Sequence, residues 1–430
     1  MTHRRPRLLL ATLYFPPVGM GGVQRPLKFA RYLPEFGWDV TVLTPDPAAH
    51  MAADESLLRD IPAGVEILRV PWAVPGQAFR VKDRTSTVRR DPPKWTKAIQ
   101  HWLRWPDDKR GFARIAFSVA IDRHKRDPFN AVLTTSPPPS IHLLGMRLKH
   151  NVSIPWVADF RDPWLMRNDD WGPTAIHAAY ARRLYRRILQ QTDHVIAVNE
   201  AIAECQGATG SNSSLEVIHN GYDESDFAAI EAAPPPSTDF SILLYGTFGE
   251  PIDPEPVFRL LAEWRRHCPR PLRVRHTGVF RGQSILDVAA RHGCSDLVES
   301  TGYLPHAAAV SQLIAADCLI LPISSEPSYR TTVPGRVFEM LRSQRPIVLL
   351  ADQAQATRRL IHQFDGVWCV DAGDVTAGCS ALDAIADLKR GMPVRTVASI
   401  RKFDRREQTG RLAAILDRIL SHPTTGAPRG

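Results

Sequence analysis

Short hydrophobic runs alternate with amphipathic segments along the whole chain. In the first half, the pattern predicts strands at residues 8–15, 39–44, 131–135, 156–160, 194–198 and 215–218. Helical periodicity lies between them, at residues 26–36, 140–149, 175–191 and from residue 200 onward. Strands that alternate with helices in this way are typical of α/β folds, in which helices cover both faces of a parallel sheet.

The pattern starts afresh after the proline-rich stretch "AAPPPSTD", the clearest linker in the chain. Strands are predicted at residues 240–245, 272–277, 318–322, 346–350 and 367–370, and helices at 255–267, 307–315 and 334–342. We therefore expect two Rossmann-like, doubly wound domains over residues 1–232 and 237–402, with a last helix, 405–420, packing back on the first domain. Ligands of such folds bind beyond the carboxyl ends of the strands, which predicts a central cleft between the domains as the site.

Composition agrees with a folded two-domain protein. The chain has 430 residues, of which 44% are hydrophobic and 23% charged. Its six cysteines form no C-x-x-C pair, so we expect reduced thiols in a cytoplasmic protein. The run "RLLLATLYF" precedes prolines and glycines, which favours a first strand over a signal peptide. No apolar run is long enough to cross a bilayer, so we expect a soluble or peripheral protein.

The net charge of +9 is unevenly distributed. Lys and Arg outnumber Asp between Arg80 and Arg126, and a second basic cluster lies within "YARRLYRRILQQ". The aromatic residues interleaved with the first cluster are Trp95, Trp102, Trp105 and Phe112. A solvated face is one interpretation, but the aromatic residues favour an anionic membrane surface or an anionic lipid. No nucleic-acid-binding module accompanies the charge, so we expect no nucleic-acid partner.

A glycine-rich loop, "GMGGVQR", joins the first predicted strand to the first helix. Glycines at positions 19, 21 and 22 match neither G-x-G-x-x-G nor the P-loop. Such a loop can turn its backbone N–H groups toward an oxyanion, and the dipole of the following helix favours negative charge there. A tight turn without a ligand is the alternative.

The segment "VPGRVFEML" combines a helix start with two opposite charges. Pro334 suits a first helical turn, and Arg336 can bind a phosphate with two N–H groups. Glu339 lies about one turn further on and can accept hydrogen bonds from two adjacent hydroxyls, as on a ribose. The alternative is an ordinary Arg–Glu pair on a helix surface.

Charged residues also end the predicted strand in "WVADFRDPW". Asp159, Arg161, Asp162 and Trp164 cluster there. Charges at the end of an apolar strand indicate a functional site, although an Arg–Asp salt bridge that closes the strand explains them as well. The following "HNGYD" is interpreted as a hinge turn.

Consecutive blocks of the chain resemble family 4 glycosyltransferases, and more narrowly those of bacterial surface-polysaccharide and exopolysaccharide pathways. The blocks are "YFPPVGMGGVQRPLKFARYLPEFGWDVTVLTP", "TTSPPPSIHLLG", "IPWVADFRDPW", "EVIHNGYDESDF" and "TVPGRVFEMLRSQRPIVLL". They run in order from about residue 8 to about residue 420. The resemblance implies a GT-B architecture whose second domain holds most of the donor nucleotide. It also implies transfer with retention at the anomeric carbon, without a metal or other cofactor.

The resemblance assigns roles by position. It implies that the glycine loop borders the donor phosphates and the acceptor, that Arg336 meets the diphosphate and that Glu339 binds the ribose. The expected donor-binding residues are Gly21, Gly22, Gly246, Thr247, Arg330, Thr331, Arg336 and Glu339, and the expected catalytic residues, on the acceptor side, are Arg161 and Asp162. Two positions depart from the family pattern. Thr331 stands where a glutamate is common, and "GTFGEPIDPE" has acids where many members carry Arg and Lys.

We therefore expect a glycosyltransferase that moves a sugar from a nucleotide sugar to a glycan or a polyprenyl-diphosphate-linked oligosaccharide in polysaccharide biosynthesis. It would work at the cytoplasmic face of the cell membrane, as a peripheral protein. Two alternatives remain at this point: a sugar-nucleotide epimerase of the GT-B fold, and a non-catalytic protein that binds a nucleotide sugar or a lipid. Turnover of nucleotide sugars distinguishes the three.

Overall fold

The computed structural model divides the chain into two compact units. Unit 1 comprises Met1–His219 and Gln408–Gly430, and unit 2 comprises Asn220–Glu407. The structure describes residues 4–19, 21–47, 53–71, 106–107, 109–164, 174–207, 214–228, 238–249, 251–281, 284–389 and 391–421. Most of the basic, tryptophan-bearing segment therefore lies outside the described residues.

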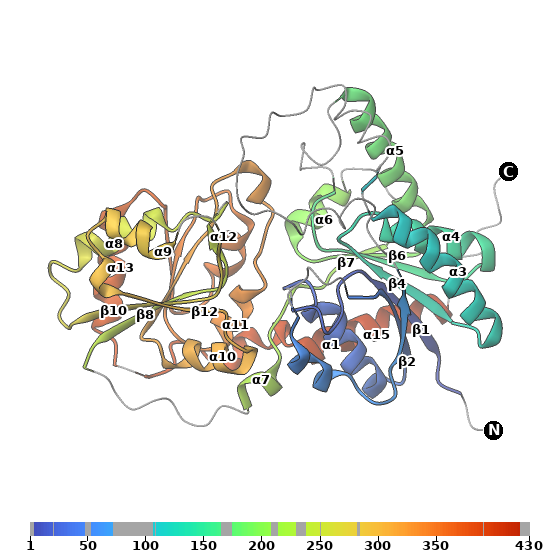
Figure 1. The fold of residues 1–430 in the computed structure, drawn as a ribbon, viewed down its shortest axis with the longest axis horizontal. Coiled ribbons are helices and arrows are strands. Elements are labelled where there is room, and N and C mark those ends of the chain that lie inside the picture. The colour runs from blue at the N-terminus through green and yellow to red at the C-terminus, as the bar shows by residue number, and fades with distance from the viewer. Residues whose placement is uncertain are drawn as a thin grey trace. The chain divides into compact units, whose positions relative to one another are not determined.

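Unit 1 is built on a parallel sheet of seven strands in the order β3-β2-β1-β4-β5-β6-β7 (Figure 1). The strands are β1 (Arg7–Thr12), β2 (Asp39–Pro45), β3 (Glu66–Val70), β4 (Ala131–Thr135), β5 (Trp156–Phe160), β6 (His194–Ala197) and β7 (Ser214–Val217). The helices are α1 (Gln24–Tyr32), α3 (Arg110–Arg126), α4 (Ile141–Val152), α5 (Ala175–Gln191), α6 (Glu200–Gly207) and α15 (Arg405–Ser421), with short 3₁₀ turns η1 (Leu33–Phe36) and η2 (Glu55–Asp60). Each predicted strand of the first half is present, and the mainly half-buried β3 is an addition.

The alternation of side chains along β1 shows why this sheet carries helices on both faces. Leu9 and Ala11 point into a core shared with α3, α4 and α5. Leu8 and Leu10 point into the opposite core, which includes residues of α1 and α15. Both sets are fully buried, as expected for a parallel sheet covered on two sides (Figure 1).

The last helix completes the second of these cores. Leu412, Ile415 and Leu416 of α15 are fully buried in the same cluster as Leu8 and Leu10. Nε1 of Trp38 also donates to Oδ1 of Asp417 at 3.0 Å. From Gln408 onward, the C-terminal helix is therefore an integral part of unit 1.

Unit 2 repeats the plan with a six-stranded parallel sheet in the order β12-β10-β8-β13-β14-β15. Its strands are β8 (Phe240–Tyr245), β10 (Leu272–Thr277), β12 (Val298–Gly302), β13 (Cys318–Pro322), β14 (Ile347–Leu350) and β15 (Val367–Val370), and a small second sheet pairs β9 (Phe248–Gly249) with β11 (Phe280–Arg281). Its helices are α7 (Glu224–Ala228), α8 (Glu255–Trp264), α9 (Ile285–Arg291), α10 (His306–Ala315), α11 (Arg336–Arg342), α12 (Ala356–Ile361), α13 (Val375–Ala386) and α14 (Val397–Ile400). Its short 3₁₀ turns are η4 (Ser295–Leu297), η5 (Pro327–Tyr329) and η6 (Arg401–Phe403).

Several elements differ from the sequence predictions, and helices α9, α12 and α13 are among those that were not predicted. The segment Arg110–Arg126, interpreted as a basic insertion, is helix α3, and its Phe112 is fully buried rather than part of an aromatic surface. The helix predicted at 334–342 begins at Arg336. Strand β12 was missed because its sequence, "VESTG", is polar and it lies at a sheet edge.

The division between the units falls after His219, ahead of the proline-rich stretch. Residues that follow His219 bond within unit 2: Tyr222 N donates to Phe403 O at 3.2 Å, and Arg405 N donates to Tyr222 O at 2.9 Å. Nε of Arg342 donates to Oε2 of Glu224 at 2.7 Å. These bonds attach α7 to unit 2.

Candidate functional site

The carboxyl end of β8 forms the candidate site of unit 2. Gly246 follows the strand with φ of +104°, in the left-handed region that favours glycine. A Cβ there would lie 2.5 Å from Nη1 of Arg336, so only glycine leaves room for that guanidinium. The Gly246 carbonyl faces Nε2 of His276 at 3.2 Å, which fixes the turn against β10.

Arg336 begins α11 and reaches this turn with incomplete hydrogen bonding. Its Nη1 donates to Thr247 O at 3.1 Å, and its guanidinium lies 4.9 Å from the centre of the Phe248 ring. Its Nε and Nη2 are buried and find no hydrogen-bond acceptor among the described residues. Burial lowers the pKa of Arg336 to about 10, so the side chain stays cationic at neutral pH. Buried N–H groups without acceptors are uncommon, and an anion or a water molecule can supply the acceptor.

Glu339, one turn further along α11, has partners on two other elements. Tyr245 OH donates to its Oε2 at 2.8 Å, and Nε2 of His306 lies 3.0 Å from its Oε1. Burial raises the pKa of the Glu339 carboxyl, but the hydrogen bonds from His306 and Tyr245 outweigh burial, and the net shift is downward. Glu339 is therefore a carboxylate at neutral pH.

These contacts rule out the surface Arg–Glu pair as the explanation of "VPGRVFEML". Arg336 bonds to the loop after β8, and Glu339 bonds to β8 and α10. The structure thus brings Gly246, Thr247, Arg336 and Glu339 together around one strand end. Of the other expected donor residues, Arg330 is exposed at the end of η5 and Thr331 is buried.

Arg161 organises the corresponding strand end in unit 1, after β5. Its Nε donates to Ser136 O and its Nη1 to Gly22 O, both at 2.5 Å. Its Nη2 is buried and has no hydrogen-bond acceptor among the described residues. Burial lowers the pKa of Arg161, while Asp159 and Asp162 oppose that shift. Asp162 is exposed beside it.

The two glycines of the loop differ in their surroundings. A Cβ on Gly22 would lie 3.3 Å from the Tyr14 ring and 3.4 Å from Nη2 of Arg161. A Cβ on Gly21 would meet nothing within 4 Å among the described residues. Gly22 therefore makes room for Arg161, whereas Gly21 faces open space.

Asp159, by contrast, belongs to a closed ion pair inside unit 1. Arg25 donates to both of its carboxylate oxygens, at 2.9 and 2.8 Å, and Thr135 Oγ1 donates to it at 2.7 Å. The exposed fraction is 2% for Arg25 and zero for Asp159. The salt bridge that closes the strand is thus present, but its arginine is Arg25 of α1 and not Arg161.

Sequence reasoning missed the partners that hold the charged side chains. Tyr245, His306 and Arg25 were not singled out, although Tyr245 ends a strand directly before a glycine and Arg25 follows the glycine loop. His306 gave no comparable signal. The described residues contain no group of three or more His, Cys, Asp or Glu side chains that could hold a metal ion.

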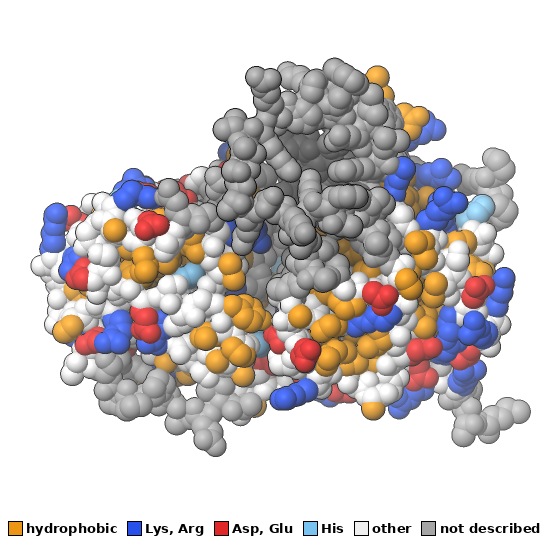
Figure 2. Space-filling model, in the orientation of Figure 1, with side chains coloured by type: hydrophobic (Ala, Val, Ile, Leu, Met, Phe, Trp, Pro, Cys, Tyr) orange, Lys and Arg blue, Asp and Glu red, His pale blue; other side chains and the backbone are white. Residues whose placement is uncertain are grey.

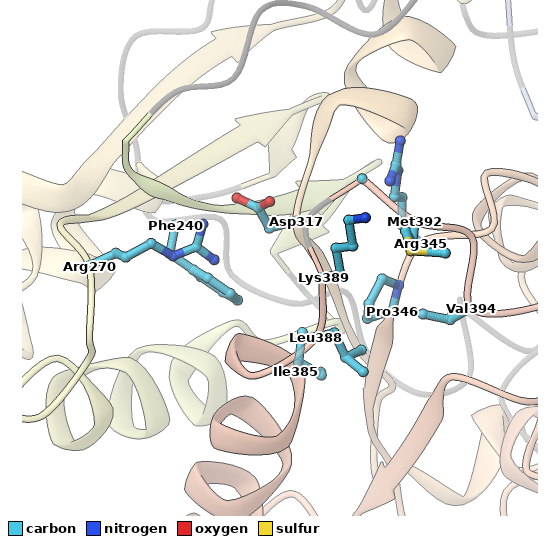
Figure 3. A pocket seen from close by; sticks show the side chains of 11 residues that line it. Phe240, Arg270, Asp317, Arg345, Pro346, Ile385, Leu388, Lys389, Met392 and Val394 are labelled. Carbon is cyan, nitrogen blue, oxygen red and sulfur yellow. The ribbon is translucent and has the colours of Figure 1, made fainter.

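A small pocket of unit 2 lies at the other end of the strands from the candidate site (Figure 3). Phe240 begins β8, and Asp317 and Pro346 directly precede β13 and β14, so the pocket is at the amino ends of these strands. Arg345 and Lys389 also line it. The expected donor residues do not line this pocket.

Helix α5 presents a basic surface with exposed apolar side chains. Its arginines 182, 183, 186 and 187 are exposed, as are Ile176 and Tyr180, with exposed fractions of 62% and 52%. Figure 2 shows basic and hydrophobic side chains along the edge where Figure 1 places α5, α4 and α3. No helix in the described ranges is long and apolar enough to span a membrane.

Comparison with known structures identifies the architecture. Sucrose-phosphate synthase from Thermosynechococcus elongatus has 14% identity and a TM-score of 0.64, covering 97% of this chain and all of that one. HepE of Anabaena, in complex with UDP, has 14% identity and a TM-score of 0.62, covering 96% of this chain and all of that one. WaaG, a glycosyltransferase involved in lipopolysaccharide biosynthesis, has 13% identity and a TM-score of 0.55, with 97% and 100% covered. At such identities the likeness shows the fold.

The sequence comparison concerns mainly unit 1. Residues 21–221 match the model of the glycosyl transferase 4-like domain. A search of curated proteins gives no match. The predicted fold and the predicted resemblance are both confirmed: the chain has the two Rossmann-like units of the GT-B fold, and its residues 21–221 match a glycosyl transferase 4-like domain.

Proposed function

We propose that the protein transfers a sugar from a nucleoside-diphosphate sugar to a glycan or a polyprenyl-diphosphate-linked oligosaccharide, with retention at the anomeric carbon and without a metal ion. The observation that carries this proposal is Arg336, whose Nε and Nη2 are buried without acceptors among the described residues. A diphosphate supplies both the oxygen atoms and the negative charge that this guanidinium lacks. The UDP complex of HepE, which shares the fold, supports a nucleotide in such a site.

Glu339 fits the ribose of the same donor. Each of its oxygens has one protein partner, and a carboxylate offers about four lone-pair positions. The remaining positions can accept hydrogen bonds from two adjacent hydroxyls. The lowered pKa of Glu339 keeps the carboxylate ionised and therefore able to accept them.

The reaction follows from where charge develops. As the bond from the anomeric carbon to the diphosphate oxygen breaks, the leaving group gains negative charge and the sugar becomes cation-like. Arg336 stabilises the leaving group more strongly in this state than in the bound donor. The acceptor oxygen bonds to the anomeric carbon on the face that the diphosphate leaves, and its proton passes to a departing phosphate oxygen. Configuration is thereby retained.

We assign the acceptor to unit 1. Arg161 offers one buried N–H without an acceptor among the described residues, and Asp162 is exposed next to it. Gly21 faces open space, so a ligand can approach the backbone of the loop. Arg161 would orient the acceptor, and Asp162 would hydrogen-bond to its hydroxyl groups.

We further propose that the protein works as a peripheral protein at the cytoplasmic face of the membrane, in polysaccharide biosynthesis. A polyprenyl-linked acceptor stays in the bilayer, so the enzyme must approach it. The exposed arginines of α5, with Ile176 and Tyr180, suit an anionic surface. The role of WaaG in lipopolysaccharide biosynthesis fits an acceptor of this kind.

Turnover tests the proposal directly. Purified protein is incubated with a panel of radiolabelled nucleotide sugars, with and without EDTA and a polyprenyl-diphosphate glycan. We expect slow release of nucleoside diphosphate alone, faster release with acceptor, and no effect of EDTA. An isomerised sugar nucleotide would instead identify an epimerase, and binding without any product would identify a non-catalytic protein. Loss of transfer in EDTA that added Mg²⁺ restores would contradict metal independence.

A further inference from the structure

We propose that His306 positions the Glu339 carboxylate and makes donor binding depend on pH. The inference rests on the proposed function, because it takes Glu339 as a donor ligand. His306 is the first residue of α10 and lies between two carboxylates of unit 2. Its Nε2 is 3.0 Å from Oε1 of Glu339, and its Nδ1 is 3.7 Å from Oδ2 of Asp226 in α7.

Two elements fix the orientation of Glu339. Tyr245 at the end of β8 binds one carboxylate oxygen, and His306 faces the other. With both oxygens held, the carboxylate cannot rotate freely, and its remaining lone pairs keep one direction. A preorganised acceptor binds the two hydroxyls of a ribose without first losing side-chain entropy.

The protonation state of His306 changes its interaction with the two carboxylates, Glu339 and Asp226. A neutral imidazole has one N–H, whereas an imidazolium directs one N–H toward each carboxylate, at hydrogen-bond distance from Glu339 and at ion-pair distance, 3.7 Å, from Asp226. When His306 loses its proton, either Glu339 or Asp226 faces a lone pair. The same step removes a positive charge close to the proposed diphosphate site. Both changes weaken donor binding as pH rises.

Tyr245 and Arg336 keep one charge state near neutral pH. Burial raises the pKa of Tyr245 well above its ordinary value, so Tyr245 remains a neutral donor. Arg336 on α11 stays cationic, and Arg405, at the start of α15, adds positive potential at Glu339. Among the side chains that contact Glu339, imidazole is the type whose charge can change between about pH 5 and 8.

Helix α7 gives His306 a rigid second partner. Glu224, two residues before Asp226, receives a hydrogen bond from Nε of Arg342 at 2.7 Å. The helix that carries Asp226 is thus bound to the helix that carries Glu339. His306 contacts both of these helices, α7 and α11, at a second point. The positions of its two carboxylate partners are therefore fixed when its protonation changes.

The test measures dissociation constants by titration calorimetry from about pH 5.5 to 8.5. UDP-glucose and GDP-mannose are the probes, because their diphosphates are doubly esterified and do not titrate in this range. The variants are His306→Gln, His306→Ala, Asp226→Asn and Glu339→Ala. His292→Gln is the matched control, since Nε2 of His292 lies 2.5 Å from Oε1 of Glu255 in a pair outside the proposed donor residues.

We expect the wild-type dissociation constant to rise about three- to tenfold across this range. His306→Gln should remove the rise, because an amide N–H donates at every pH. His306→Ala should weaken donor binding about tenfold at the lowest pH of the range. Asp226→Asn should reduce the pH dependence without changing Glu339, and His292→Gln should keep the wild-type profile. Melting curves show whether each variant is folded. If His306→Ala does not fold, the pH dependence measured with Asp226→Asn tests the proposal instead.

Two failures are distinguishable. If the wild type binds neither probe, or if Glu339→Ala binds as tightly as the wild type, the proposed donor site is wrong. If Glu339→Ala loses binding while His306→Gln and Asp226→Asn keep the wild-type pH profile, the donor site stands and the role of His306 is wrong.

Discussion

Two arginines, the buried Arg25 of unit 1 and the half-buried Arg336 of unit 2, differ in how completely their hydrogen bonds are made. Arg25 of unit 1 donates to both oxygens of Asp159 and, through Nη1, to His219 O at 2.7 Å. Arg336 of unit 2 donates to one carbonyl and keeps two buried nitrogens without acceptors among the described residues. A guanidinium whose three nitrogens all have acceptors holds a fold together, whereas one with nitrogens that lack acceptors can bind an anion.

The same contrast appears between two charged residues at the end of β5, Asp159 and Arg161. Asp159 accepts from Arg25 and Thr135 inside the core. Arg161, two positions later, retains an unused N–H beside the glycine loop. Sequence alone could not separate them, since both are charges that end an apolar strand.

The largest effect is expected on breaking the satisfied pair. Asp159→Asn leaves the buried charge of Arg25 uncompensated, which should lower the free energy of unfolding of unit 1 by about 3–5 kcal/mol. Urea denaturation followed by tryptophan fluorescence measures it. Asp296→Asn is the control, because its pair with Arg265 is exposed and should contribute little to stability. Equal losses in both variants would contradict a structural role for Asp159.

Removing Arg336 should have the opposite effect: donor binding should weaken while stability stays nearly unchanged. Arg336→Ala should weaken nucleotide-sugar binding by about 1.5–3 kcal/mol, roughly tenfold to over a hundredfold, and change stability little. Glu339→Ala should weaken binding to a similar degree, through the ribose. Calorimetry on folded variants measures both. Unchanged affinity in both variants would show that these charges serve the fold alone.

The fold was predictable because it follows from local pattern. The run Leu8–Leu9–Leu10–Ala11 is apolar at every position, as a strand buried on both faces requires. Helix α3 was missed because its buried face consists largely of alanines, such as Ala113, Ala116 and Ala120, whose hydrophobic signal is weak beside many charges.

The candidate site was predictable only in part, because its contacts join distant positions. Arg336 and Glu339 stand within one motif and were identified. Their partners do not share that motif: Tyr245 is 94 residues from Glu339, and His306 is 33 residues away. Arg25 and Asp159 are separated by 134 residues. No spacing rule within one sequence specifies such pairs, since they depend on which strand ends lie together.

The glycine loop offers a smaller effect in unit 1. The added side chain of Gly22→Val should displace the Tyr14 ring and Nη2 of Arg161. The rate of sugar transfer should fall about tenfold or more, with a modest loss of thermal stability. Gly21→Ala places a methyl group in open space and should not change stability. Transfer rates and melting temperatures test both. If Gly21→Ala lowers transfer, a ligand approaches the loop; if Gly22→Val retains activity, the loop is only a turn.

The smallest effect per residue is expected from the exposed arginines of α5. Near an anionic membrane each basic residue contributes about 1 kcal/mol, so replacing one by Gln should weaken binding about fivefold. We expect the protein to sediment with anionic but not zwitterionic vesicles, and less at high salt, because salt screens this attraction.

Neutralising arginines 182, 183, 186 and 187 together should release the protein from these vesicles, whereas Arg266→Gln in unit 2, equally exposed, should not. A separate variant neutralises Arg89, Arg90, Lys94 and Lys97, which lie outside the described residues, and shows how the two basic clusters share the binding. The effect is cumulative, because exposed charges act through the summed potential and not through one bond. Equal sedimentation on both lipids, or sedimentation that survives both sets of substitutions, would show that these arginines form only a solvated face.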